Sequence, residues 1–442
     1  MTTIAASQIH TLSVTGLANA VAKGDLTPKD VAEAVLARIS QLEPKVQAWS
    51  YFDAKRIREE ARVLTEEAAA GRLRGPLHGV PIGIKDEFHV RGMPTGFLDR
   101  PTPMPEPEDA TPVARLRAAG AIIVGKTYMP NYSLGMRMCP TRNPWNLEHT
   151  PGGSSSGSGA AVSARMVPVA ISEQTGGSGL RPAAYCGVDG LMPTYGRVSR
   201  FGCVPFAWSQ DRVGIIGLTM EDIALVLSVI AGPDPRDPTT LPDPVPPAKL
   251  DMHGMRPPRI GVVRNFFPER SEPVMRDAVD NAAKRLGEAG ATVQDYMLPN
   301  MFGLAWDAVG IVSGVEGAAF NAQRVVAGLE PGTTANAGER RLGAIIPATY
   351  YLHAQRIRRW LHVKVAASFR DLDAILMAPT TDPRSKGCYN HRNRLAATRV
   401  ELPGLPGHHH QRRPLARWHA RWAPDRRGAE GRVPLAPCRR MV

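Results

Sequence analysis

Reactive side chains are concentrated in residues 151–187, a glycine- and serine-rich stretch with serines at 154–156 and a further one, Ser178, after a Gly-Gly pair. A serine hydroxyl is a weak nucleophile, and it needs a neighbouring base before it can attack a carbonyl carbon. A phosphate-binding loop is disfavoured because it requires Gly-Lys-Ser/Thr, and this stretch contains no lysine. Nucleophilic chemistry on serine is therefore the first hypothesis.

Two other interpretations fit the stretch less well. Residues 153–157 match the G-x-S-x-G pattern of a nucleophile elbow, which needs a strand before it and an acid and a histidine after it. Residues 143–151 are loop-like, and no suitable acid and histidine pair follows. A flexible linker is disfavoured by the apolar continuation at 160–162. The remaining interpretation uses two serines and a lysine.

An ordered set of motifs makes the chain resemble the amidase signature family over roughly residues 10–240, with weaker similarity to about 380. The motifs are Gly83-Ile84-Lys85-Asp86, Gly125-Lys126-Thr127, Asn143-Pro144-Trp145, Pro151-Gly152-Gly153-Ser154-Ser155, Thr175-Gly176-Gly177-Ser178, Arg181-Pro182-Ala183-Ala184-Tyr185-Cys186-Gly187 and Pro193-Thr194-Tyr195-Gly196-Arg197-Val198-Ser199. The resemblance implies the amidase signature fold, an α/β architecture whose mixed, mostly parallel β-sheet core is flanked by helices on both faces.

The resemblance also implies a Ser–Ser–Lys triad, with Lys85 as the base, Ser154 as the bridging serine and Ser178 as the nucleophile. Lys85 ends the apolar run 79–84, so we expect its side chain to be buried. Burial disfavours the charged form of lysine and lowers its pKa, which would make the amine a base. The competing interpretation is an ordinary surface or ion-paired lysine beside Asp86.

The resemblance further implies a cis peptide bond between Gly153 and Ser154, with the Ser154 hydroxyl as a proton relay. Glycines allow positive φ angles and let successive N–H groups converge on one anion. The N–H groups of Thr175, Gly176 and Gly177, together with that of Ser178, are therefore the predicted oxyanion hole.

The implied reaction hydrolyses a carboxylic amide to a carboxylate and ammonia or an amine through a seryl acyl-enzyme, without a metal or an organic cofactor. In many family members an arginine stands two residues after the nucleophile, but here Leu180 holds that place and Arg181 follows. The later spacing resembles members that act on small amides bearing a carboxylate. A buried arginine can bind a carboxylate through two parallel hydrogen bonds. Arg181 is thus a candidate substrate-binding residue, with a structural ion pair as the alternative.

The elements expected around these motifs alternate between helices and strands. Thr27 followed by Pro28 and Asp30 predicts a helix start, and the apolar positions after it recur at helical spacing. Further helices are expected at 53–70, 111–119, 221–231 and 274–289, and strands at 79–85, 121–125 and 259–263. This alternation is typical of an α/β protein with a largely parallel sheet.

Composition excludes several classes of protein. The chain has 442 residues, 54 Lys+Arg against 41 Asp+Glu, and 43% hydrophobic residues, which is ordinary for a globular protein. Its five cysteines are scattered and form no CxxC pair, so a disulfide framework or a zinc site is not expected. No apolar run is long enough for a membrane span, and the N-terminus does not resemble a secretory signal. A cytoplasmic protein is expected.

Residues 407–442 form an unusual tail with nine arginines, two acidic residues and the run His408-His409-His410. The tail is interpreted as a disordered basic arm, as a metal-binding histidine run, or as a stretch translated out of the native frame. We favour the third, because a one-base shift of the codons for 417–428 encodes an amino-acid sequence with the residue alternation of folded β structure. We expect an amidase domain at 1–406, with its catalytic core at about 70–240 and a proline-rich linker at about 232–258.

Three functions are compatible with these observations. The leading one is a stand-alone amidase acting on a small-molecule amide, and a homodimer is left open. The second is the A subunit of a tRNA-dependent amidotransferase, and the third is a truncated, inactive amidase homologue. Nucleic-acid binding is not expected, because no basic stripe with interleaved aromatic residues precedes the tail.

Overall fold

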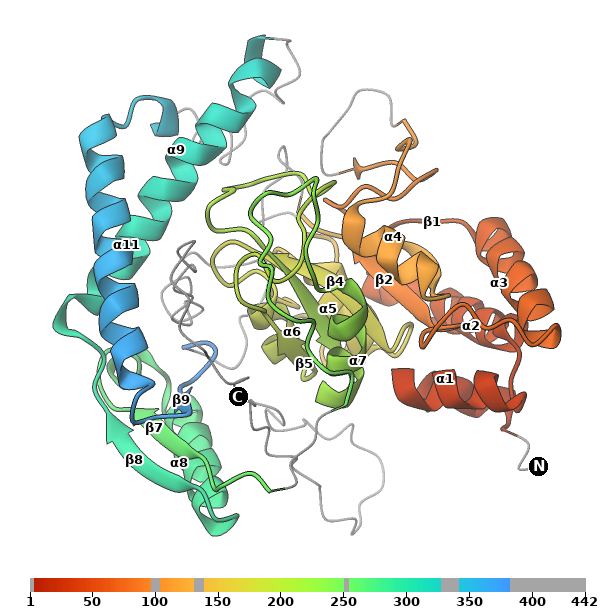
Figure 1. Cartoon of the computed structure of the whole chain (residues 1–442), viewed down its shortest axis with the longest axis horizontal. Helices are drawn as coiled ribbons and strands as arrows, with labels where there is room; N and C mark the ends of the chain where they lie inside the picture. The colour runs from red at the N-terminus through yellow and green to blue at the C-terminus, as the bar shows by residue number, and fades with distance from the viewer. Residues whose placement is uncertain (1–3, 97–103, 131–138, 250–253, 327–341, 382–442) are drawn as a thin grey trace.

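A computed structural model describes residues 4–96, 104–130, 139–249, 254–326 and 342–381 (Figure 1). The tail predicted at 407–442 lies outside the described residues, so its three interpretations and the proposed domain limit at 406 stay predictions.

The first half of the chain builds a six-stranded sheet with its helices. Its elements are η1 (Ala6–Thr11), α1 (Val14–Lys23), α2 (Pro28–Val46), β1 (Trp49–Phe52), α3 (Ala54–Ala69), β2 (Pro81–Lys85), α4 (Thr111–Ala118), β3 (Ile122–Thr127), α5 (Ser156–Ser163), β4 (Val169–Gln174), α6 (Leu180–Tyr185), β5 (Asp189–Leu191), β6 (Arg212–Gly217) and α7 (Met220–Ile230). The strand order is β1-β3-β2-β4-β6-β5. β2 lies at the centre and pairs in parallel with both β3 and β4.

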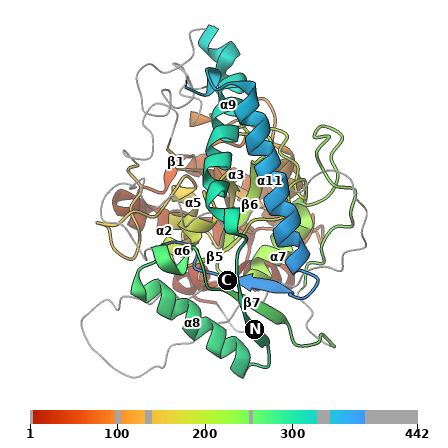
Figure 2. The same ribbon diagram turned by 90° about the vertical axis from the view of Figure 1, so that its left-hand side faces the viewer.

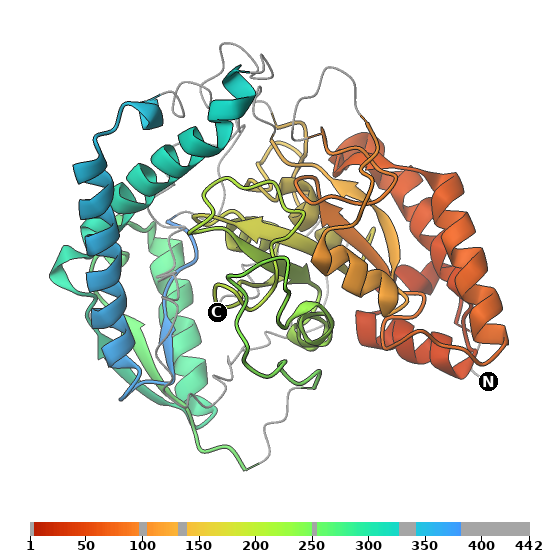
Figure 3. The ribbon, with the colours of Figure 1, turned by 45° about the horizontal axis from the view of Figure 1, so that its top comes forward.

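The rest of the described chain forms a three-stranded parallel sheet with a helical layer. Its elements are β7 (Arg259–Val263), η4 (Pro268–Arg270), α8 (Pro273–Glu288), β8 (Thr292–Tyr296), η5 (Asn300–Leu304), α9 (Ala305–Val326), α11 (Ala348–Ser368) and β9 (Ala374–Leu376). Figures 1 and 3 show α9 and α11 on one side of the larger sheet and α1, α2 and α3 on the opposite side. The turned view in Figure 2 shows α9 and α11 side by side.

Both sheets fit the predicted fold class. Four of the seven strand pairings in the described residues are parallel, and the three antiparallel ones involve β1, β5 and β6. The mixed, parallel-rich α/β architecture predicted from the sequence is confirmed. The antiparallel strands lie toward the two edges of the larger sheet, whereas the pairs around β2 are parallel.

Side-chain alternation along the strands explains why helices cover both faces of the larger sheet. On β4, Val169 and Ile171 pack with residues of α1, α4 and α7, while Ala170 packs with residues of α2, α3 and α5. Successive side chains of a strand point to opposite faces, and both faces here are apolar. The central strands are therefore shielded from water on both sides.

Local signals mark the predicted element boundaries well. Thr27 caps α2 by accepting a hydrogen bond from the Asp30 N–H, and the Asp30 carboxylate accepts one from the Thr27 N–H. This reciprocal pair satisfies two N–H groups that the first helical turn leaves without partners.

The linker predicted at 232–258 is irregular through residue 249, with Asp234 anchored by the Ser199 hydroxyl at 2.6 Å. No helix in the described part of the chain is long and apolar enough to cross a membrane.

The core predicts a specific stability loss. Ile215 on β6 has no exposed surface, so Ile215→Ala is expected to lower the free energy of unfolding by about 2–5 kcal/mol. The matched control is Val274→Ala on α8, where the native side chain is 52% exposed and little change is expected. Urea unfolding of the three proteins checks this, and equal losses for both variants would contradict the assigned core.

Candidate active site

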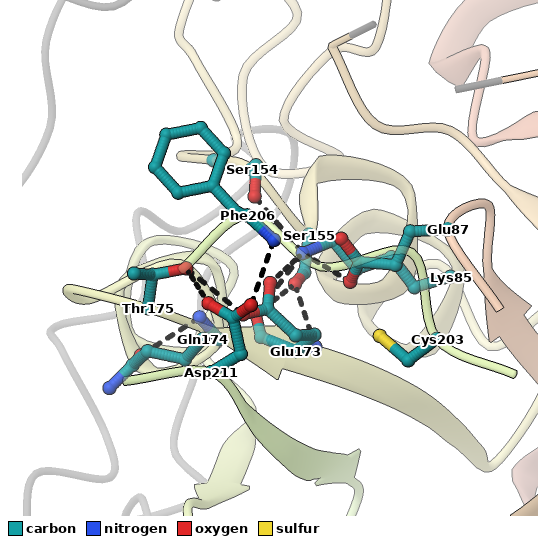
Figure 4. A network of polar contacts seen from close by, with 12 residues as sticks. Lys85, Glu87, Ser154, Ser155, Glu173, Gln174, Thr175, Cys203, Phe206 and Asp211 are labelled. Carbon is teal, nitrogen blue, oxygen red and sulfur yellow. Dashed lines mark hydrogen bonds and ion pairs between the residues drawn. The ribbon is translucent and has the colours of Figure 1, made fainter. Parts of the chain in front are cut away.

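The pairing of β2 with β4 brings the predicted lysine to a polar cluster at the ends of these strands. Lys85 is the last residue of β2, and Glu173 lies near the end of β4. The Lys85 Nζ donates hydrogen bonds to the Ser154 Oγ at 3.0 Å, to the Glu173 Oε2 at 2.8 Å and to the Glu173 main-chain oxygen at 3.2 Å. A fourth oxygen, the Glu87 Oε1, lies 2.9 Å away (Figure 4).

The loop before α5 carries the serine predicted as the bridge. The Gly153–Ser154 peptide bond is cis, as expected. The Ser155 hydroxyl donates to the Glu173 main-chain oxygen at 3.1 Å, and the Ser156 hydroxyl donates to the Gly152 oxygen at 2.7 Å. These hydrogen bonds fix the loop so that the Ser154 hydroxyl reaches the lysine.

The nucleophile predicted at Ser178 lies on the turn between β4 and α6. The Ser155 N–H donates to the Ser178 main-chain oxygen at 3.0 Å, so the two serine loops are in direct contact. The Ser178 side chain is half-buried, and within the described ranges no hydrogen bond joins its hydroxyl to that of Ser154. Such contacts are often loose without substrate and tighten when it binds.

The glycine turn has the backbone shape that an anion site requires. Gly177 has a φ of +115°, a conformation that residues with a Cβ rarely adopt. The Gln174 Oε1 accepts the N–H groups of Gly179 and Leu180 at 2.9 Å each, which pins the far end of the turn. Within the described chain, the N–H groups of Gly176 and Gly177 donate to no backbone carbonyl. They can therefore receive a substrate oxygen.

Arg181 contacts the loop that carries Ser154. Its side chain is buried, and its Nη1 donates to the Gly153 main-chain oxygen at 3.0 Å. This contact holds the peptide that precedes Ser154, so Arg181 has a structural task. Its use as a substrate contact stays a prediction.

The direction of the pKa shift expected at Lys85 needs correction. Burial alone would lower the pKa of Lys85, but the charges of Glu173 and Glu87 outweigh burial and raise the pKa of Lys85 above its ordinary value. This direction is opposite to the expectation that burial lowers the pKa of Lys85. The alternative of a surface lysine is wrong, because Lys85 has no exposed surface. Lys85 is ion-paired, but with Glu87 and Glu173, while the neighbouring Asp86 Oδ1 contacts the Lys126 Nζ at 2.9 Å.

One cation faces several buried carboxyl groups, and this imbalance shifts their titration. Burial, followed by the charge of Glu173, raises the pKa of Glu87 well above its ordinary value. The same two causes raise the pKa of Asp211 to about 8, against hydrogen bonds from the Thr175 hydroxyl and two N–H groups. Excess negative charge is costly in a buried site, and this cost raises both pKa values.

Glu87, Glu173 and Asp211 were missed in the sequence. Glu87 follows the lysine motif by one residue, and Glu173 precedes the glycine turn within an otherwise buried strand. A charged residue in a fully buried strand is rarely left unpaired, and this was the available signal. The partner depends on strand order, which a single sequence does not give.

Comparison with known proteins shows the family to which the chain belongs. The family model described as Amidase matches residues 30–395, so the chain belongs to the amidase family. It is 42% identical over 302 residues to the A subunit of the glutamyl-tRNA(Gln) amidotransferase of Roseiflexus sp. (strain RS-1), a match that covers 66% of this chain and 61% of that protein. The chain thus matches less than two thirds of the length of that relative.

Two further matches extend over more of the chain. The A subunit of the glutamyl-tRNA(Gln) amidotransferase of Pseudomonas fluorescens (strain Pf0-1) is 34% identical over 439 residues, and the match covers 90% of each chain. The native peptide amidase from Stenotrophomonas maltophilia superposes with a TM-score of 0.73 at 29% identity, over 87% of this chain and 88% of that one. The fold and the family are therefore shared with enzymes named for amide chemistry.

The second buried ion pair predicts a large change in stability. Asp86→Asn leaves the fully buried Lys126 without its carboxylate, so we expect the free energy of unfolding to fall by about 3–5 kcal/mol. The double variant Asp86→Asn with Lys126→Met removes both charges and should lose less. Chemical denaturation checks the order, and an Asp86→Asn protein as stable as the native one would contradict the assigned pair.

Proposed function

We propose that the chain is an amidase that hydrolyses a carboxylic amide to a carboxylate and ammonia or an amine, with Ser178 as the nucleophile. The observation that carries the proposal is the contact of 3.0 Å between the Lys85 Nζ and the Ser154 Oγ, beside the turn that bears Ser178. A base must lie within hydrogen-bond reach of the proton it removes, directly or through one bridging group.

The reaction proceeds through an acyl-enzyme. The Ser178 hydroxyl loses its proton through the Ser154 hydroxyl toward Lys85, and its oxygen attacks the amide carbon. The N–H groups of the turn at 175–178 stabilise the oxyanion, where loss of one donor typically costs about 2.7–4 kcal/mol. The returning proton goes to the leaving nitrogen, and water then hydrolyses the ester bond by the same steps in reverse.

The substrate class is a small-molecule amide. Amides that bear a carboxylate are the first group to test, because Arg181 lies beside the serine loop and guanidinium binds carboxylate well. The chain requires no metal or organic cofactor in this scheme. We place the enzyme in the cytoplasm.

A second candidate function is that of the A subunit in a glutamyl-tRNA(Gln) amidotransferase. It is favoured by the identity of 34%, across 90% of both chains, with the relative from Pseudomonas fluorescens. A stand-alone amidase hydrolyses small amides without partners. An amidotransferase component would co-elute with its partner proteins on gel filtration and would need them for activity.

A fluorophosphonate probe tests the nucleophile without knowledge of the substrate. The native protein should be labelled at Ser178, and Ser178→Ala should not be labelled. Ser154→Ala and Lys85→Met should react about 100- to 10,000-fold more slowly, because general base assistance is worth that factor. Peptide mass spectrometry locates the label, and a folded native protein that stays unlabelled would favour an inactive homologue.

A further inference from the structure

The site contains carboxyl groups in addition to the three side chains of the Ser–Ser–Lys triad. Glu173 and Glu87 both contact the Lys85 Nζ, and both side chains are nearly fully buried. We propose that Glu173 acts through Lys85 as a positioning residue and is the final acceptor of the proton that leaves Ser178. Lys85 stays an ammonium ion and passes this proton on. The inference rests on the proposed amidase function, because it concerns activation of the same nucleophile.

The contacts of Lys85 are those of a donor. Three oxygens from Glu173 and Glu87, and the Ser154 hydroxyl oxygen, lie within 3.2 Å of its nitrogen. An ammonium ion has three N–H donors and no lone pair, so it can accept a proton from Ser154 only as it gives one away. The Glu173 Oε2 at 2.8 Å is the nearest acceptor.

Glu173 suits this role better than Glu87. Glu87 approaches the Lys85 Nζ through its Oε1 at 2.9 Å, whereas Glu173 contacts it through a carboxylate oxygen at 2.8 Å and through its main-chain oxygen at 3.2 Å. Glu173 is held in place, because its main-chain oxygen accepts the Ser155 hydroxyl, and its Oε1 lies 3.1 Å from the Thr175 hydroxyl oxygen. The carboxylate is therefore fixed between the lysine and the turn that carries the nucleophile.

The titratable groups around this carboxylate come from three parts of the fold. β2 and the turn after it supply Lys85 and Glu87, and the segment before β6 supplies Asp211. The loop that bridges to Phe88 supplies Cys203, whose thiol pKa is raised well above its usual value by burial and these carboxylates. Figure 4 shows all of them around Glu173.

The proton balance of the step is closed. The Ser178 O–H bond breaks as the proton moves to the Ser154 oxygen, the Ser154 proton moves to the Lys85 nitrogen, and one Lys85 proton moves to Glu173. Lys85 has the same charge before and after, and the negative charge of Glu173 is transferred to the attacking oxygen. Expulsion of the amine reverses the relay, because the leaving nitrogen takes up the proton that Glu173 held.

The test compares Glu173→Gln with the native enzyme by the rate of fluorophosphonate labelling at Ser178 across pH. The glutamine keeps the shape of the side chain but accepts no proton. We expect labelling near neutral pH to fall about 100-fold or more, in line with loss of general base assistance, and to rise with pH only where Lys85 itself loses a proton. Glu173→Asp retains a carboxylate and should recover part of the loss with a pH profile of native shape.

The matched control is Glu43→Gln, which alters a carboxylate that accepts the N–H groups of Ala48 and Trp49 elsewhere in the fold. Its labelling should equal that of the native enzyme. If Lys85 acts as a free amine instead, Glu173→Gln lowers its pKa, and labelling stays the same or becomes faster. That result overturns the inference while native labelling at Ser178 still supports the amidase function.

A second measurement covers the case in which Glu173→Gln does not fold. The ¹³Cε signal of Lys85 in the native enzyme, assigned by its loss in Lys85→Met, reports the charge of the amine. It should stay at the ammonium position over the whole pH range in which Ser178 is labelled. Titration of this signal to the neutral amine within that range would overturn the inference.

Discussion

A primary amine with no exposed surface lies at the end of a central strand. The ion pairs and hydrogen bonds that replace its lost water determine the arrangement of the site around it. Lys85 gains its burial from β3 and β4 on either side and from apolar helices on both faces of the sheet. A buried ammonium is costly unless ion pairs and hydrogen bonds replace its lost water. Glu173, Glu87 and Ser154 supply that replacement, and they are also the groups that could move a proton.

The same contacts link the scaffold to the chemistry. Ser155 binds the Glu173 main chain through its hydroxyl and the Ser178 main chain through its N–H, so one residue joins the lysine cluster to the turn that carries Ser178. The Arg181 side chain binds the Gly153 main-chain oxygen, and the Gln174 side chain binds the N–H of Gly179 at the end of the turn that carries Ser178. Groups fixed in this way need little rearrangement when charge develops on a substrate, which is how preorganised sites lower a barrier.

Much of this arrangement could be predicted from the sequence, because the motifs are local. The strand that ends in Lys85 and the capped start of α2 need only neighbouring residues. The cis bond before Ser154 was implied by the resemblance to the family. The carboxylates around the lysine could not be predicted, since Glu173 is 88 residues away and meets Lys85 only through the strand order. The adjacency of Lys85 and Asp86 in the sequence suggested an ion pair that does not form. Successive side chains of an extended chain point in opposite directions, and Asp86 pairs with Lys126.

The charge on Lys85 decides between a free amine and a relay as the source of nucleophile activation. Neutron diffraction from crystals of the deuterated native protein locates these protons directly. We predict three deuterons on the Lys85 Nζ and none on the carboxylate of Glu173. Two deuterons on the Lys85 Nζ with one on Glu173 would contradict the relay.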